Sequence, residues 1–174
     1  MSLQSIAAFI LISSILLWYF TTIQSTRTLY FQGEVNTSVD RVFEHLIQPK
    51  NFLGLQPLLI SVENIKEINQ TTTYYEAVEL FNFYIISIHN RIKVEFTTVK
   101  GLNDPHIYFH VESPGSVTID SHLQLIGIQG RTKLQYEFKI DYPFYLQWLV
   151  ISSATNAQET LLKNLAARLD EKIE

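Results

Sequence analysis

The clearest pattern in the chain is an alternation of apolar and polar residues through its second half. Apolar side chains there recur at every second position, which is typical of β-strands with one buried face. In one such segment Ile88, Ile92 and Val94 share a face, whereas His89 and Arg91 lie on the other. The alternation covers residues 84–96, 106–112, 116–128 and 131–142. Residues 58–68 and 71–81 are predicted as two more strands, because Thr and Tyr favour extended chain.

Helical spacing flanks this run of strands on both sides. Before it, apolar residues from Val39 to Ile47 follow the capping candidates Thr37 and Ser38, and Pro49 ends this predicted helix. A second short helix is predicted over residues 51–57. After the strands, one apolar stripe predicts a long amphipathic helix. Its members are Leu146, Leu149, Val150, Ser153, Ala154, Ala157, Leu161, Leu165 and Leu169.

The stretch LYFQG, residues 29–33, has two interpretations. It is similar to a protease-cleavage tag, but Arg27 and Thr28 stand where such a tag carries Glu and Asn. Its alternation of Leu29, Phe31 and Gly33 with polar residues is that of a strand. We therefore expect a first β-strand here.

The first 26 residues have the composition of a membrane anchor. No charged side chain occurs from Ser2 to Thr26, and the apolar centre runs from Ile6 to Phe20. A bilayer core needs about 20 helical residues. We expect a single transmembrane helix over residues 3–23 and two domains, residues 1–26 and 27–174; a cleaved signal peptide is the alternative.

The side of the membrane is indicated only by weak signals. Arg27 follows the apolar segment, and the positive-inside tendency then places the following domain in the cytosol. Glycosylation triplets at Asn36 and Asn69 favour the opposite side.

Composition excludes several classes of function. The 174 residues are 47% hydrophobic, with a net charge of −4 and no cysteine. The absence of cysteine removes disulfide scaffolds, cysteine zinc sites and thiol nucleophiles. No basic face or run is present, so nucleic acid is not an expected partner. No cofactor or metal is expected, and the oligomeric state is left open.

The order of predicted elements is one strand, two short helices, about six strands and one long helix, which is an α+β arrangement. The opening GEVNTSVDRVFEHL, with Ser38, Asp40, Val42, Phe43 and Leu46 at the matching places, resembles that of the helix-grip superfamily. This group includes START-like, Bet v 1-like, polyketide cyclase and coenzyme Q-binding proteins (SRPBCC). The resemblance implies a curved antiparallel sheet of about seven strands around the C-terminal helix, with an apolar cavity between them.

Such a cavity would be lined by the apolar faces of the strands and the helix. The expected lining is Ile86, Ile88, Asn90, Ile92, Phe109, Ser121, Leu123, Leu125, Tyr136, Phe138, Trp148, Leu149 and Ser153. Asn90 and Ser121 are either satisfied polar groups of a core or anchors for the polar end of a ligand. Phe144 and Tyr145 belong to an aromatic cluster that is either a core plug or a cavity mouth whose rim contacts the bilayer.

No Asp, Glu, His or Lys side chain falls on the apolar face of the clearest strands. Glu76 and Glu79 are the exception, because one of them must share a face with apolar residues of the segment YYEAVEL. The four strand histidines, His89, His106, His110 and His122, fall on the polar face. His106 and His110 are about 13 Å apart along one strand, too far to share a zinc ion. A cross-strand pair of His89 with His110 or His122 stays open.

These observations favour a membrane-anchored, non-catalytic protein that binds a lipid, sterol or isoprenoid in an apolar cavity. One alternative is a cyclase or aromatase-like enzyme that uses Glu76 or Glu79. A second alternative is an interaction module whose core is filled by its own Phe and Tyr side chains.

Overall fold

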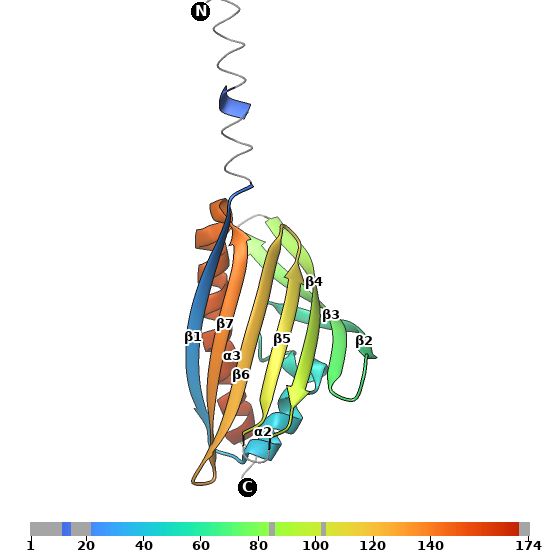
Figure 1. Ribbon diagram of the computed structural model, residues 1–174, viewed down its shortest axis with the longest axis vertical. Helices are drawn as coiled ribbons and strands as arrows, with labels where there is room; N and C mark the ends of the chain where they lie inside the picture. Colours follow the sequence, from blue (N-terminus) through green and yellow to red (C-terminus); the bar gives the residue numbers. More distant parts are fainter. Residues whose placement is uncertain (1–11, 15–21, 84–85, 102–103, 171–174) are drawn as a thin grey trace, which may run out of the picture.

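The computed structural model describes residues 12–14, 22–83, 86–101 and 104–170. Seven antiparallel strands form one sheet in the order β1-β7-β6-β5-β4-β3-β2 (Figure 1). The strands are β1 (Gln24–Val35), β2 (Leu59–Glu67), β3 (Thr72–Phe83), β4 (Ile86–Val99), β5 (His106–Ser113), β6 (Val117–Ile128) and β7 (Arg131–Pro143). The helical elements are α2 (Val39–Leu46), the 3₁₀ helices η1 (Pro49–Phe52) and η2 (Phe144–Leu146), and α3 (Gln147–Asp170).

The N-terminal strand answers the question raised by LYFQG. Residues 29–33 lie inside β1, which pairs with β7 from Gln24 opposite Pro143 to Val35 opposite Thr132. The stretch LYFQG is therefore part of the folded domain, as predicted. Gly33 is needed for close packing, because a Cβ there would lie 3.2 Å from Cδ2 of Leu162 on α3. The glycine thus lets the long helix approach the strand.

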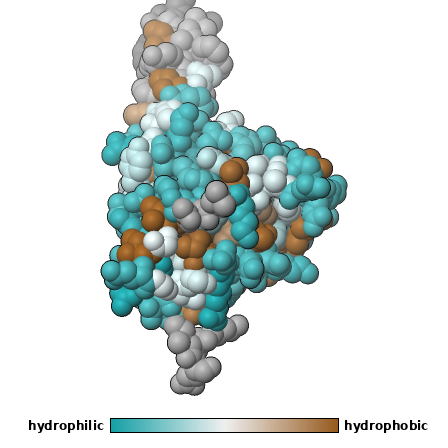
Figure 2. Space-filling model, turned by 60° about the horizontal axis from the view of Figure 1, so that its bottom comes forward, coloured by the Kyte–Doolittle hydropathy of each residue, from teal (hydrophilic) through white to brown (hydrophobic). Residues whose placement is uncertain are grey.

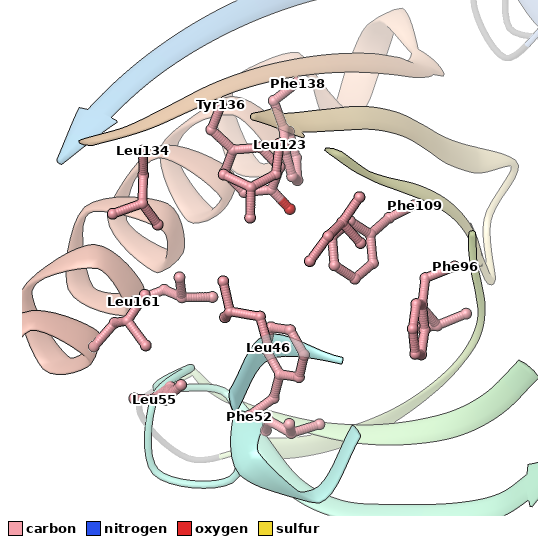
Figure 3. Close-up of a cluster of buried hydrophobic side chains, with 14 of the residues drawn as sticks. Leu46, Phe52, Leu55, Phe96, Phe109, Leu123, Leu134, Tyr136, Phe138 and Leu161 are labelled. Carbon is pink, nitrogen blue, oxygen red and sulfur yellow. The ribbon is translucent and has the colours of Figure 1, made fainter. Parts of the chain in front are cut away.

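The predicted alternation sets which face of the sheet is buried. Ile92, Val94 and Phe96 of β4 are buried, and the intervening Lys93 and Glu95 are exposed. The same rule holds along β5, β6 and β7. The buried faces of these strands, helix α2 and helix α3 enclose one hydrophobic core (Figure 3).

The long helix contributes its predicted stripe to this core. Ala157, Leu161, Leu165 and Leu169 are buried and recur at every fourth position. They bring one side of α3 against the sheet, and α3 runs beside β1 and β7 in Figure 1. Polar residues on its other side remain exposed, as expected for an amphipathic helix.

The second short helix is placed differently from the prediction. It is the 3₁₀ helix η1 over Pro49–Phe52, whereas residues 53–58 form turns. Pro49 occupies the first helical positions, where a missing N–H costs no hydrogen bond. Gly54 then reverses the chain with a φ of 76°.

Most of the predicted anchor, residues 1–11 and 15–21, lies outside the described residues. Within the described residues, no helix has both the length and the apolar character needed to span a bilayer. The first strand begins at Gln24, three residues before the domain start that we placed at residue 27. On the face that Figure 2 shows, the folded part is mainly hydrophilic with scattered apolar patches.

Candidate ligand cavity

A cavity of about 260 Å³ lies between the sheet and the first half of α3. Its apolar walls come from β3 and β4 on one side, with Phe81, Ile88 and Ile92, and from the helix on the other, with Leu149 and Val150. The remaining wall is supplied by β5, β6, β7 and the turn after β5, through Val111, Pro114, Val117, Ile119 and Phe138.

Side-chain size along α3 explains why the hollow is at this end. Where the helix faces the cavity, its inward residues are Ser153, Ala154 and Ala157, which are small. One and two turns further on they are Leu161 and Leu165, which fill the space. Between the second half of α3 and the sheet, a void of only about 10 Å³ remains. The cavity therefore follows from the residue volumes of the helix stripe.

A small polar cluster interrupts the apolar lining. The side chain of Asn90 donates from Nδ2 to Oε2 of Glu79 at 3.4 Å and to Oγ of Ser113 at 3.0 Å. Burial raises the pKa of the Glu79 carboxyl above its ordinary value, and the hydrogen bond from Asn90 offsets this only in part. Glu79 forms no ion pair with any Lys, Arg or His in the described part of the chain.

Gln158 of α3 is a further polar residue at the cavity. It is 3% exposed, and its Oε1 atom accepts no hydrogen bond from the described residues. The sequence analysis did not single it out. Helical spacing could have identified it, because position 158 lies four residues after Ala154 and three before Leu161, on the same helical face.

The expected lining residues divide into four groups. Six of them line the cavity: Ile88, Asn90, Ile92, Phe138, Leu149 and Ser153. Five are buried in the packed core instead: Phe109, Ser121, Leu123, Leu125 and Tyr136. Phe109, Leu123 and Tyr136 meet Leu46 of α2 and Leu161 of α3, whose larger side chains fill this part of the space. The side chain of Ile86 is outside what the structure describes.

Trp148 lies outside the cavity. It is 81% exposed, because it lies about 100° around the helix from its inward neighbour Leu149. Phe144 and Tyr145, expected at the mouth, are 45% and 57% exposed. They do not line the cavity, but they immediately precede Leu146, which does. The three exposed aromatic residues, Phe144, Tyr145 and Trp148, are called the aromatic rim below.

The two glutamates of β3 point to opposite faces of the sheet. Glu79 shares a face with the buried Tyr75 and Ala77, whereas Glu76 lies on the outer face. There Arg91 binds Glu76 at 2.7 Å and also contacts Glu63 at 3.0 Å. The hydrogen bond from Arg91 is the main cause that lowers the pKa of Glu76. Glu76 is thus excluded from the cavity.

Ser121 is satisfied inside the core. Its hydroxyl donates to the hydroxyl oxygen of Tyr136 at 3.4 Å, and both residues are buried. Burial raises the pKa of Tyr136 to about 12. Ser121 is therefore a satisfied polar group of the core, which is the first of its two predicted alternatives. Asn90, by contrast, lies at the cavity.

The strand histidines lie on the outer face of the sheet. His106 and His122 form a cross-strand contact of 2.8 Å between Nδ1 and Nε2, and the Tyr108 ring stacks on both imidazoles. The sequence analysis left cross-strand histidine pairs open without naming this one; the two histidines are diagonal neighbours, since the register places Tyr108 opposite His122. His110 contacts Asp120 at 2.7 Å. Among the described residues, no three His, Asp or Glu side chains lie close enough together to hold a metal ion.

Comparison with known proteins identifies similar structures but no similar sequence. No protein-family model matches the chain, and no curated protein matches it significantly. Among solved structures, TTHA0849 from Thermus thermophilus has a TM-score of 0.69 at 14% identity, covering 85% of this chain and 100% of the other. The Zhui aromatase/cyclase from Streptomyces sp. R1128 has a TM-score of 0.67 at 11% identity, covering 86% and 97%.

Norcoclaurine synthase from Thalictrum flavum, crystallised with dopamine and hydroxybenzaldehyde, has a TM-score of 0.62 at 11% identity, covering 90% of this chain and 93% of the other. At sequence identities this low, structural similarity establishes the fold but not the activity. The seven-stranded sheet, the long C-terminal helix against it and these similarities agree with the resemblance seen in the opening residues. The chain therefore has the helix-grip fold, a curved antiparallel sheet against a long C-terminal helix.

Proposed function

We propose that this protein binds a hydrophobic small molecule in the cavity between the sheet and α3, without transforming it. The observation that carries the proposal is the cavity itself, an apolar hollow of about 260 Å³ beside an otherwise filled core. Each buried CH₂ group of a ligand contributes about 0.8 kcal/mol. Ligand pockets commonly measure roughly 300–1,000 Å³. The volume here favours a short acyl chain or a small isoprenoid over a sterol.

Titration with the neutral fluorescent probe N-phenyl-1-naphthylamine tests the proposal. We expect saturable binding to the full-length protein, and the variant Ala154→Phe should weaken it at least tenfold because the new ring occupies the cavity. Asn156→Phe is the matched control, since it adds the same ring at an exposed position of α3. No saturable binding, or equal binding by all three proteins, would overturn the proposal.

We further propose that the N-terminal segment tethers the domain with the cavity end toward the bilayer. The backbone N–H of Phe144 donates to the carbonyl of Ile23 at 2.9 Å, so the aromatic rim lies where the uncharged segment Ser2–Thr26 leads into β1. Trp and Tyr side chains favour the membrane interface. A tether at this end would let a ligand pass between the cavity and the lipid over a short distance.

Fluorescence quenching in phosphatidylcholine vesicles tests this orientation. The chain has two Trp residues, so in a Trp18→Phe variant Trp148 is the reporter. Brominated lipids should quench Trp148 strongly. A control that carries Trp18→Phe, Trp148→Phe and Tyr30→Trp reports from the exposed middle of β1 and should stay unquenched. Quenching that is equal at both positions, or absent at Trp148, contradicts the proposed orientation.

A cyclase or aromatase-like enzyme is the second candidate. Glu79 favours it, because a carboxyl with a raised pKa at a cavity is suited to general acid–base chemistry. The similarity to an aromatase/cyclase supports the same candidate at the level of fold. Incubation with a synthetic poly-β-ketone thioester, followed by mass spectrometry, separates the two. An aromatic product that disappears in Glu79→Gln would replace the binding proposal.

The hypothesis of a core filled by its own aromatic side chains fits only part of the molecule. Phe109 does pack against both Phe52 and Phe96 in the filled part of the core. The cavity half keeps its 260 Å³ hollow. A purely structural core is therefore not proposed.

A further inference from the structure

We propose that the polar end of the cavity binds the protonated amino group of an apolar amine. The proposal rests on the proposed binding function and specifies the chemistry of the ligand. The site consists of Glu79 on β3, Asn90 on β4 and Gln158 on α3, all of which line the cavity.

Glu79 supplies a negative charge that the described residues do not balance. It is the only titratable side chain among the described residues that line the cavity, and its hydrogen bond is the 3.4 Å contact from Asn90. A buried carboxylate without a cation is unfavourable, and burial accordingly raises the pKa of Glu79. An ammonium group on a bound ligand would provide the missing counter-charge and favour the ionised carboxylate.

Gln158 adds an acceptor for which the described residues supply no donor. Its side chain is almost completely buried, and Oε1 makes no hydrogen bond with the described residues. Buried acceptors without a partner are rare because they cost free energy. Gln158 and Glu79 approach the same cavity from the helix and from the sheet. A ligand group with several N–H donors can satisfy both.

The charge of the cavity lining disfavours other head groups. A carboxylate ligand would place a second negative charge near Glu79, and no Lys, Arg or His side chain lines the cavity in the described part of the chain. An alcohol has one hydrogen to donate, whereas an ammonium group has three and carries the charge that Glu79 needs. The cavity thus distinguishes apolar amines from fatty acids and fatty alcohols.

Competition at pH 7 against bound N-phenyl-1-naphthylamine tests the proposal with three ligands of one chain length. We expect n-octylamine to displace the probe at least tenfold more effectively than n-octanol, and octanoate to be the weakest. In Glu79→Gln the advantage of the amine over the alcohol should fall to about twofold or less. In Gln158→Leu it should fall by about threefold. Glu76→Gln, on the outer face, should retain the full advantage.

The outcomes separate this proposal from the proposed function. Displacement by octanol and octylamine with equal strength overturns the amine proposal and leaves an apolar binding site. An amine advantage that persists unchanged in Glu79→Gln also overturns it, because the charge would then come from elsewhere. Failure of the probe and of all three ligands to bind overturns both proposals.

Discussion

The two halves of the space between α3 and the sheet are built from the same elements and differ in how far they are filled. Leu161, Leu165 and Leu169 of the second half of the helix are buried in the core, and the void that Leu161 and Leu46 line measures about 10 Å³ (Figure 3). The first half presents Ser153, Ala154 and Ala157, and leaves about 260 Å³. The difference teaches that one half of the interface is filled by its own side chains, whereas the other half keeps the hollow on which the binding proposal rests.

Polar groups are distributed between the halves in the same way. In the packed half Ser121 and Tyr136 satisfy each other. In the cavity half Glu79 lacks a counter-ion and Gln158 lacks a donor among the described residues. A core would exclude such groups, because buried polar atoms without partners destabilise the folded state. Their place beside the cavity is what the binding proposal predicts.

The largest expected effect comes from truncating the packed half. Leu165→Ala should lower the free energy of unfolding by about 2–5 kcal/mol, because Leu165 is fully buried and its removal leaves a void. Leu149→Ala, on the cavity wall, should cost about 1 kcal/mol or less, since its side chain is already only partly packed. Urea denaturation measures both. Equal losses would mean that the cavity half contributes to stability as much as the core does.

Adding volume should also destabilise the packed half more than the cavity half. Ala166 packs against the filled core, so Ala166→Phe should destabilise by about 1–3 kcal/mol through overpacking. Ala154→Phe places the same ring in the cavity and should leave the free energy of unfolding unchanged or slightly raised. Thermal and urea unfolding of the two variants provide the check. A large loss in Ala154→Phe would show that the hollow cannot accept a ring.

The two glutamates of β3 should respond oppositely to neutralisation. The pKa of Glu79 is raised in the folded state, so wild-type stability falls as the pH rises from the unfolded to the folded pKa. Glu79→Gln should therefore stabilise the protein at pH 7 by about 1 kcal/mol, and by nothing at low pH. The pKa of Glu76 is lowered, so its contribution is present at neutral pH and lost as the pH falls through the folded pKa.

Urea titrations at several pH values measure this difference. Glu76→Gln is the matched control, and it should slightly destabilise the protein at pH 7 because it breaks the exposed pair with Arg91. A Glu79→Gln variant that is less stable than wild type at pH 7 would contradict the absence of a counter-ion at that carboxyl.

The smallest expected effect is in the satisfied polar pair of the packed half. Tyr136→Phe removes the acceptor of the Ser121 hydroxyl and should cost about 0.5–1 kcal/mol at neutral pH. The pKa of Tyr136 is raised to about 12, so the wild-type protein loses stability as the pH rises through and above the ordinary tyrosine range. The difference between the two proteins should therefore shrink in alkaline buffer. A difference that grows instead would mean that the phenolate is stabilised in the core.

Several features of the site could be predicted from the sequence. Strand alternation identified Ile88, Asn90 and Ile92 as one face, and all three line the cavity. The apolar stripe of the C-terminal helix likewise predicted Leu149 and Ser153 as inward residues, and both line the cavity. These predictions succeed because the side-chain period of a strand or helix is a local property of the backbone.

Other features depend on contacts between distant segments. Glu76 and Glu79 could not be distinguished locally, because both faces of YYEAVEL carry apolar residues; the buried neighbours Tyr75 and Ala77 decide the matter in the fold. The His106–His122 contact depends on the register between β5 and β6. Phe109 and Tyr136 were expected at the cavity, but the large residues opposite them place them in the core.

The sequence by itself determined the order of the elements, the inward faces of the strands and the helix stripe, because these follow from local periodicity and residue volume. Only the tertiary structure decided where along the helix the hollow lies, which glutamate faces it and that no other described residue donates to Oε1 of Gln158. Each of these depends on which side chains from distant strands meet α3, and that pairing is fixed by packing across the whole sheet.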